Sequence, residues 1–134
     1  IFTRSIPYLV ISYTLISSGK IACKYSSQYH HYIVVNNRNK AIGCVGVRRF
    51  EDGICEMKRL YVKPGFRGKK VGRLLAEAAI EWAKGPRYKA MRLDTVSSMV
   101  SANNLYRTLG FKEIGPYREN PLQGAIYMEL NLED

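Results

Sequence analysis

Short runs of β-branched and other apolar residues, separated by turn residues, predict three neighbouring strands. Tyr32–Val35 is one such run and ends at the turn pair Asn36-Asn37. Lys40–Phe50 follows as a second strand, and the turn Glu51-Asp52-Gly53 leads to a third, Ile54–Val62. Because the connections are short, we expect an antiparallel meander.

The hydrophobic period changes from strand to helix after Pro64-Gly65, which ends the third strand. Apolar residues then recur at the i, i+3, i+4, i+7 and i+11 positions of one helix face: Val71, Leu74, Leu75, Ala78 and Trp82. Arg73 and Glu77 are four residues apart on the polar side of this predicted helix. Gly85-Pro86 ends it.

Another strand and a second helix follow. Ala90–Val96 is expected to lie parallel to Ile54–Val62, through a right-handed crossover. Ser97 or Ser98 can cap the next helix. One face of that helix is apolar: Ala102, Leu105, Tyr106 and Leu109. Gly110 is expected to end it as a left-handed cap, with the next residue packing back.

Two closing strands complete the pattern, Phe111–Tyr117 and Ala125–Leu130. The order strand, strand, strand, helix, strand, helix, strand, strand predicts an α/β (α+β) fold, a mixed sheet with helices. The first 31 residues are harder to interpret. Pieces such as Tyr8–Ile11 and Tyr13–Ile16 fit strands or a short helix equally well.

Composition predicts a single domain over residues 1–134, with 46% hydrophobic and 24% charged residues. Three cysteines stand apart in the sequence: Cys23, Cys44 and Cys55. With no CxxC pair and an odd count, they favour a reducing, cytoplasmic setting without disulfides or zinc. His30 and His31 lack ligand spacing, so no metal is expected. Ile6–Ile16 is only about half as long as a membrane-spanning helix, so no membrane partner is expected.

The net charge of +10 is concentrated in one stretch. Seven basic residues and no acidic one occur between positions 58 and 73: Lys58, Arg59, Lys63, Arg67, Lys69, Lys70 and Arg73. Such a field attracts a polyanion, whether nucleic acid, an anionic membrane or a phosphorylated cofactor. Stacking aromatics in the stretch are limited to Tyr61 and Phe66, and no nucleic-acid motif is present, which argues against a nucleic-acid-binding module.

The segment Phe66–Arg73 (FRGKKVGR) joins a strand to a helix and has the composition of a phosphate-binding loop. Glycines let backbone N–H groups approach a ligand closely, and the first helical turn has N–H groups without internal partners. The helix dipole favours anions there. Arg67, Lys69 and Lys70 add charge-assisted hydrogen bonds. On these residues alone, a ligand site and an ordinary loop remain equally open.

The run LYVKPGFRGKKVGRLL resembles motif A of the GNAT acetyltransferase superfamily, with the core Arg/Gln-x-x-Gly-x-Gly/Ala. Arg67 and Gly72 match this core, whereas Lys70 stands at the first glycine position. Downstream, LDTVSSMVSANNLYRTLGFKEIGPY resembles motif B. The resemblance covers residues 32–132. It implies a mostly antiparallel mixed sheet with a splayed central parallel strand pair, acetyl-CoA as donor and an amine as acceptor.

The resemblance also implies roles for particular residues. The cofactor phosphates would bind at the loop and first helical turn: Arg67, Gly68, Lys69, Lys70, Val71, Gly72 and Arg73. The pantetheine arm would lie along the backbone of Leu60, Tyr61 and Val62, with Asn103 as a further contact. Tyr106 would protonate the leaving thiolate as general acid; the alternative is a core aromatic residue.

Glu56 is the candidate base, on a strand where alternation would place it on one face with Lys58, Leu60 and Val62. The alternatives are a water chain and an ion-paired surface glutamate, and the nearby Lys58 argues against a strong base. Arg59, Tyr117 and Arg118 are candidate contacts for a carboxylate or phosphate on the acceptor.

The acceptor is expected to be the amine of a small molecule or peptide, and a homodimer is left open. Residues 1–31 would shape the acceptor site, but they follow no family pattern. Two alternative functions remain: a degenerate member of the fold that binds coenzyme A without turnover, and the nucleic-acid-binding module considered above.

Overall fold

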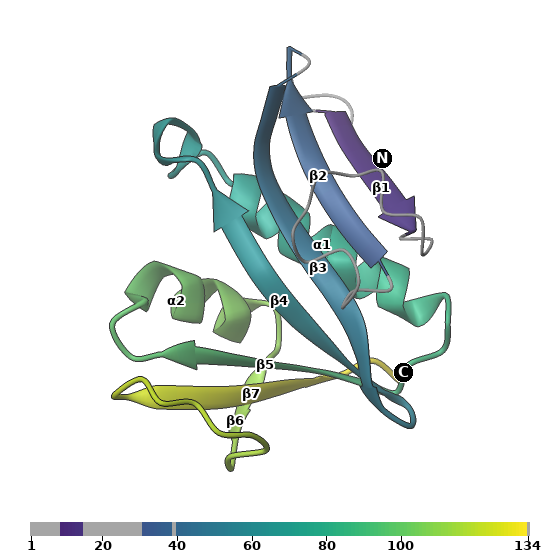
Figure 1. The fold of residues 1–134 in the computed structure, drawn as a ribbon, viewed down its shortest axis with the longest axis vertical. Coiled ribbons are helices and arrows are strands. Elements are labelled where there is room, and N and C mark those ends of the chain that lie inside the picture. The colour runs from purple at the N-terminus through teal and green to yellow at the C-terminus, as the bar shows by residue number, and fades with distance from the viewer. Residues whose placement is uncertain (1–8, 15–30, 39, 134) are drawn as a thin grey trace.

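The computed structural model describes residues 9–14, 31–38 and 40–133. Within this part of the chain, seven strands form one sheet in the order β1-β2-β3-β4-β5-β7-β6, with two α-helices (Figure 1). The elements are β1 (Leu9–Thr14), β2 (His31–Asn37), β3 (Lys40–Glu51), β4 (Ile54–Val62), η2 (Pro64–Phe66), α1 (Val71–Lys84), β5 (Ala90–Val96), α2 (Val100–Thr108), β6 (Lys112–Ile114) and β7 (Ala125–Asn131).

The predicted antiparallel meander is confirmed as strands β2, β3 and β4. At the edge, β1 pairs antiparallel with β2, with Leu9 opposite Asn36 and Thr14 opposite His31. The N-terminal segment therefore contributes a strand where the sequence left strand and helix open. The remainder of the segment, including Cys23 and His30, lies outside the described residues.

The expected parallel pairing of β4 with β5 is also confirmed, but it is short. Only Ile54–Glu56 and Ala90–Arg92 are in register. Beyond these residues the two strands diverge and form a V in Figure 1, with α2 in the view between its arms. This is the splayed central parallel pair that the resemblance implies. On its other side, β5 pairs along its whole length with β7.

Helix α1 packs against β2, β3 and β4 and has the predicted amphipathic pattern. Its buried positions include three alanines, Ala76, Ala79 and Ala83. The expected face residues Ala78 and Trp82 lie at the margin of the contact instead. Small side chains at the centre allow the helix to approach the sheet closely.

Gly43 on β3 is part of this close approach. A Cβ atom at Gly43 would lie 2.9 Å from the carbonyl oxygen of Tyr61 and 3.0 Å from a methyl group of Leu75. Neither neighbour can move without disturbing β4 or α1, so this position excludes a side chain.

Two local predictions about the second half of the chain are wrong. Neither Ser97 nor Ser98 caps α2, which begins after Met99 without a side-chain cap. Strand β6 covers only Lys112–Ile114 instead of extending to Tyr117. The pair Gly115-Pro116 interrupts it, because proline has no N–H group to donate to the sheet.

Gly110 has φ of +104° and ends α2, as predicted for a left-handed cap. The N–H of Phe111 donates to the carbonyl of Tyr106 (3.0 Å), and the two rings pack edge to face. This turn therefore fixes the orientation of the Tyr106 ring.

We predict that Gly43→Ala lowers the free energy of unfolding by about 1–3 kcal/mol, because the added methyl group overpacks the contact between β3 and α1. Urea unfolding measures this. Gly65→Ala is the matched control, since no atom lies within 4 Å of the added Cβ. Equal stabilities for the two variants would contradict the proposed close contact.

Candidate active site

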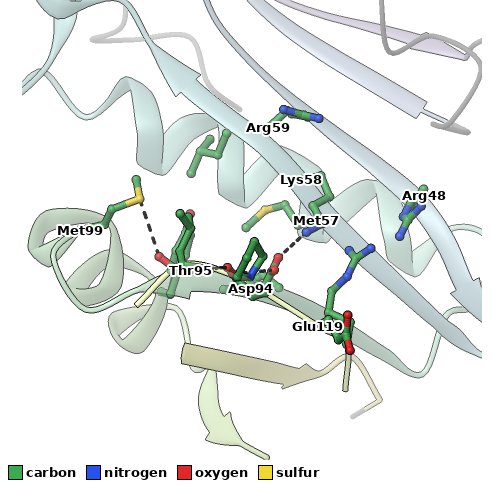
Figure 2. A pocket seen from close by; sticks show the side chains of 15 residues that line it. Arg48, Met57, Lys58, Arg59, Asp94, Thr95, Met99 and Glu119 are labelled. Carbon is green, nitrogen blue, oxygen red and sulfur yellow. Dashed lines mark hydrogen bonds and ion pairs between the residues drawn. The ribbon is translucent and has the colours of Figure 1, made fainter. Parts of the chain in front are cut away.

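A cavity of about 750 Å³ lies where β4 and β5 separate. Its walls come from β4 and β5, from α2 through Tyr106, and from the loop between β6 and β7 (Figure 2). In the view of Figure 2, Met99 lies at one end of the cavity and Arg48 at the other, with Lys58 and Asp94 between them. One end is therefore apolar and the other is charged.

The cavity lies between the separating strands and is lined by residues of both. Along β5, side chains alternate between faces. Leu93 and Thr95 point to the buried core side and Asp94 to the opposite side, yet all three line the cavity. The lining therefore includes residues whose side chains belong to both faces of β5.

A β-bulge at Arg59 shapes the β4 wall. Gly46 pairs with Lys58, but Cys44 pairs with Tyr61, so β4 has one extra residue, and Arg59 has φ of +62°. The bulge changes which face the following side chains occupy. Leu60 and Val62 pack against the core, whereas Tyr61 is half exposed.

The prediction that Glu56 shares a face with Leu60 and Val62 is therefore wrong, because it assumed regular alternation. Glu56 and Lys58 do share one face, as expected. Past Glu56, the edge of β4 that faces β5 has no strand partner among the described residues. The backbone of Leu60, Tyr61 and Val62 lies on this edge, where the pantetheine contact was predicted.

Glu56 is fully buried at the closed end of the V. Arg48 donates from Nε to Oε1 of Glu56 at 2.9 Å. Nη1 of Arg118 lies 3.0 Å from Oε1 and 2.8 Å from Oε2. The Tyr117 hydroxyl donates to Oε2 at 2.6 Å. Lys58 Nζ is 3.6 Å away. Burial, together with the hydrogen bond to Glu56, holds the pKa of Tyr117 far above its usual value.

Glu56 is thus an ion-paired residue, as one of the alternatives anticipated, although it is buried. It does not line the cavity, and its oxygens are occupied by these donors. The predicted role as base consequently has no direct path to an acceptor amine in this arrangement.

Lys58 and Asp94 form an ion pair across the opening between β4 and β5. Continuing the register of Glu56 opposite Arg92 would place Lys58 opposite Asp94, so a side-chain contact replaces backbone pairing at this level. Asn120 also donates to Asp94, at 3.1 Å, and so attaches the β6–β7 loop to the cavity wall.

Sequence reasoning missed Asp94 and Asn120. An available signal was the single carboxylate in the otherwise mostly apolar second half of β5, LDTV.

Tyr106 reaches the cavity from α2 and is otherwise buried. Burial raises its pKa to about 12. The phenol therefore stays protonated at physiological pH and can act as a hydrogen-bond or proton donor. The Tyr106 ring is part of the core, and the residue also lines the cavity; its role as general acid stays a prediction.

Asn103 was predicted to contact the pantetheine, but its side chain is buried and bonded internally. It accepts from the Thr95 hydroxyl (2.9 Å) and donates to the carbonyl of Val96 (2.9 Å). It does not line the cavity. Asn103 instead fastens the start of α2 to the end of β5.

The predicted phosphate loop lies beyond the end of β4, at the start of α1. No side chain caps α1. Lys70 has φ of +64°, a left-handed conformation that glycine adopts without strain. This explains why the motif has glycine at this position and shows that lysine adopts the same backbone.

The side chains of the loop and of the first turn of α1 have different surroundings. Arg67 donates from Nε to the carbonyl of Val62 (2.9 Å), and its guanidinium lies 5.7 Å from the centre of the Tyr61 ring. Val71 is buried, so only its backbone amide is available to a ligand. Arg73 pairs with Glu77 at 2.9 Å, as predicted.

Gly72 has room for a side chain within the protein itself. A Cβ there would approach only side-chain atoms of Leu105 and Val62, both at 3.8 Å. Packing does not require this glycine, which is consistent with a ligand lying against the first turn of α1.

Other candidate chemistry is weak. In the part of the chain that the structure describes, no cluster of His, Cys, Asp and Glu could hold a metal ion. Cys55 is buried, and burial raises its pKa to about 12, which makes it a poor nucleophile. Among the described helices, none is long and apolar enough to cross a bilayer.

Solved structures share this fold. The chain superposes on a putative acyl-CoA N-acyltransferase from Klebsiella pneumoniae with a TM-score of 0.76 and 24% identity, covering 94% of this chain and 98% of that one. A GNAT family acetyltransferase from Elizabethkingia anophelis, solved with acetyl-CoA bound, gives a TM-score of 0.75 at 18% identity, covering 93% and 98%.

The family model for the acetyltransferase (GNAT) family matches residues 7–111, so this chain belongs to the GNAT acetyltransferase family. An uncharacterised N-acetyltransferase of Schizosaccharomyces pombe is 44% identical over 93 residues, 69% of this chain and 57% of the relative. An N-acetylaspartate synthetase of Xenopus tropicalis is 31% identical over 89 residues, 66% and 33%. The chain thus spans only part of the length of these relatives.

We predict that Glu56→Ala lowers the free energy of unfolding by about 3–5 kcal/mol, because it leaves Arg48, Lys58 and Arg118 without a buried counter-charge. Chemical denaturation measures the loss. Glu77→Ala is the control, since it removes only a half-exposed ion pair with Arg73 and should cost less than about 1 kcal/mol. A small loss for both variants would show that the buried cluster is not structural.

Proposed function

We propose that this protein is an N-acetyltransferase that moves the acetyl group of acetyl-CoA to the primary amine of a small molecule by direct attack. The observation that carries the proposal is the cavity that lies between the splayed strands β4 and β5 and reaches Tyr106. Its volume of about 750 Å³ is typical of a small-molecule site. Family membership supports the donor and the reaction class.

The residues of the loop fit a diphosphate. The first turn of α1 offers backbone N–H groups without a side-chain cap, and the loop before it is cationic. The open space at Gly72 lets a phosphate approach the backbone. We assign phosphate binding to the backbone of Gly68–Arg73, with Arg67, Lys69 and Lys70 supplying charge.

The unpaired edge of β4 is assigned to the rest of the cofactor. An extended pantetheine arm can add to such an edge as another strand would, through main-chain hydrogen bonds. The bulge at Arg59 turns part of this edge toward the cavity. Its N–H groups are the donors available to the negative charge that develops on the carbonyl oxygen during attack.

When bound, acetyl-CoA supplies an activated acetyl group as a thioester. The acceptor nitrogen forms its bond to the acetyl carbon as the carbon–sulfur bond breaks. Tyr106 donates a proton to the departing sulfur and regains one from solvent. Because its pKa is about 12, Tyr106 retains that proton throughout the physiological range.

The acceptor amine must lose a proton, since a lysine-like amine has a pKa of about 10.4. We assign this proton to water in the cavity, because Glu56 is held by Arg48, Tyr117 and Arg118 and lies outside the cavity lining. We therefore assign the role of base to a water chain and not to Glu56.

Two other functions are less well supported. A nucleic-acid-binding module needs its cations free on one surface, but Lys58 pairs with Asp94 and Arg73 with Glu77. A degenerate fold without turnover would not need a phenol at the cavity wall, where Tyr106 lies.

We predict that Tyr106→Phe reduces kcat by about 10²- to 10⁴-fold, because the thiolate then leaves without a proton donor. Thiol release on an amine panel measures the rate. The thermal shift produced by acetyl-CoA should not change, because the ring remains in place. An unaltered rate would assign the proton to another donor, and loss of the thermal shift would show that Tyr106 has a binding role instead.

We predict opposite effects of Gly72→Ala on stability and on binding. The free energy of unfolding should be unchanged or up to about 1 kcal/mol higher, because alanine favours helix and has room. The affinity for acetyl-CoA, measured by calorimetry, should fall at least about tenfold, because the methyl group blocks the phosphate.

Gly115→Ala is the matched control for that experiment, since no atom lies within 4 Å of its added Cβ and the residue is outside the phosphate loop. Unchanged affinity in Gly72→Ala would place the phosphates elsewhere.

A further inference from the structure

The charged end of the cavity contains an arginine pair that the proposed acetyl transfer does not use. Arg48 on β3 and Arg118 after β6 both line the cavity, and both contact the buried Glu56 behind its wall. Their side chains remain 26% and 31% exposed. Each guanidinium is therefore anchored on one side and open to the cavity on the other.

The anchoring leaves donors available. Arg48 uses Nε and Nη2 on Glu56, so the two hydrogens of Nη1 have no partner among the described residues. Arg118 uses Nη1, which leaves Nε and Nη2 without a partner in the same set. Planar guanidinium edges of this kind match the geometry of a carboxylate.

The charges at this end nearly balance. Four cations (Arg48, Lys58, Arg59 and Arg118) and two carboxylates (Asp94 and Glu119) line the cavity. The pairing of Lys58 with Asp94 cancels one of each. Glu56 behind the wall and Glu119 on it balance the arginine pair, so recognition of an anion would depend on the available guanidinium hydrogens and not on a net charge.

Glu56 also lowers the cost of using the pair. Holding a long side chain in one position normally costs conformational entropy. Here the arginine side chains have already lost this entropy on folding, because Glu56 holds both of them and the Tyr117 hydroxyl donates to Glu56. A ligand that meets pre-positioned donors binds more tightly than one that must order them.

We propose that the acceptor is an amine that also carries a carboxylate, and that Arg48 and Arg118 bind this carboxylate while the amine faces Tyr106. The inference rests on the proposed acetyl transfer and specifies its acceptor. Arg48 and Arg118 are binding residues, and Glu56 is a positioning residue for both.

The test compares acceptors that differ only in the acid group: glycine against glycinamide, and β-alanine against β-alaninamide. Thiol release gives kcat/KM for each. We expect kcat/KM for each acid to be at least about tenfold higher than for its amide. This holds although the reacting amine of the amide compound is the less basic of the two. Phosphoethanolamine is included as the phosphate counterpart. Equal rates for acid and amide, or a preference for phosphoethanolamine, would overturn the proposal.

Variants separate carboxylate binding from folding. In Arg118→Gln, kcat/KM for the acids should fall about 10- to 100-fold through KM, and less than threefold for the amides. Arg118→Lys keeps the charge without the planar fork and should show a smaller loss of the same selectivity. Arg107→Gln, on the exposed side of α2, is the matched control. Equal loss for acids and amides would show a merely structural role and contradict the proposal.

Equilibrium binding distinguishes this proposal from the proposed transfer itself. If acetyl-CoA binds but no amine is acetylated, the transfer fails while the carboxylate site is still testable. Calorimetry with succinate, against succinamide, on the protein saturated with acetyl-CoA should detect binding by the wild type and its loss in Arg118→Gln. Failure of the wild type to distinguish succinate from succinamide would overturn the carboxylate site.

Discussion

Backbone pairing between β4 and β5 stops after three residue pairs, and the candidate site depends on what replaces it. An open sheet edge leaves N–H and C=O groups without partners, which is costly unless water, a ligand or side chains satisfy them. In this fold, Glu56 and its donors close the base of the V. Lys58 and Asp94 bridge it one level further along. Charged side chains therefore bridge the two strands at the closed end of the opening and one level beyond it.

This solution places charge where burial is expensive. Glu56 is fully buried, and a buried carboxylate is tolerated only when it is paired and hydrogen bonded. Arg48 supplies these contacts from β3, and Tyr117 and Arg118 supply them from the segment after β6. The cluster consequently ties β3, β4 and the segment after β6 together, so the integrity of the charged cavity wall and the stability of the fold are linked.

Local periodicity predicted most of the framework. The meander, the amphipathic α1, the parallel β5 and the left-handed end of α2 at Gly110 each follow from residues close in sequence. The bulge at Arg59 could not be predicted this way. A positive φ at a residue other than glycine or asparagine has no compositional signal. The reversal of faces at Leu60 and Val62, which follows from this bulge, could therefore not be predicted either.

Long-range contacts set the limit for the site residues. Glu56 was the candidate base in the sequence, but its partners Tyr117 and Arg118 lie 61 and 62 positions away. No periodicity connects them. For Asn103, the spacing of one helical turn from Tyr106 suggested a contact with the pantetheine, but the hydrogen bonds to Thr95 and Val96 decide where its side chain points.

The two ends of the site differ in how they recognise a ligand. This explains why the proposed cofactor end could be predicted from the sequence and the proposed acceptor end could not. The proposed cofactor end relies on backbone: a helix start, a left-handed residue at Lys70 and a bare Gly72. Such features constrain residue type locally and produce a motif. The proposed acceptor end relies on side chains from β3 and the segment after β6, brought together only by the sheet. Changing those side chains alters the acceptor without altering the fold, so acceptor chemistry has to be inferred from the assembled cavity.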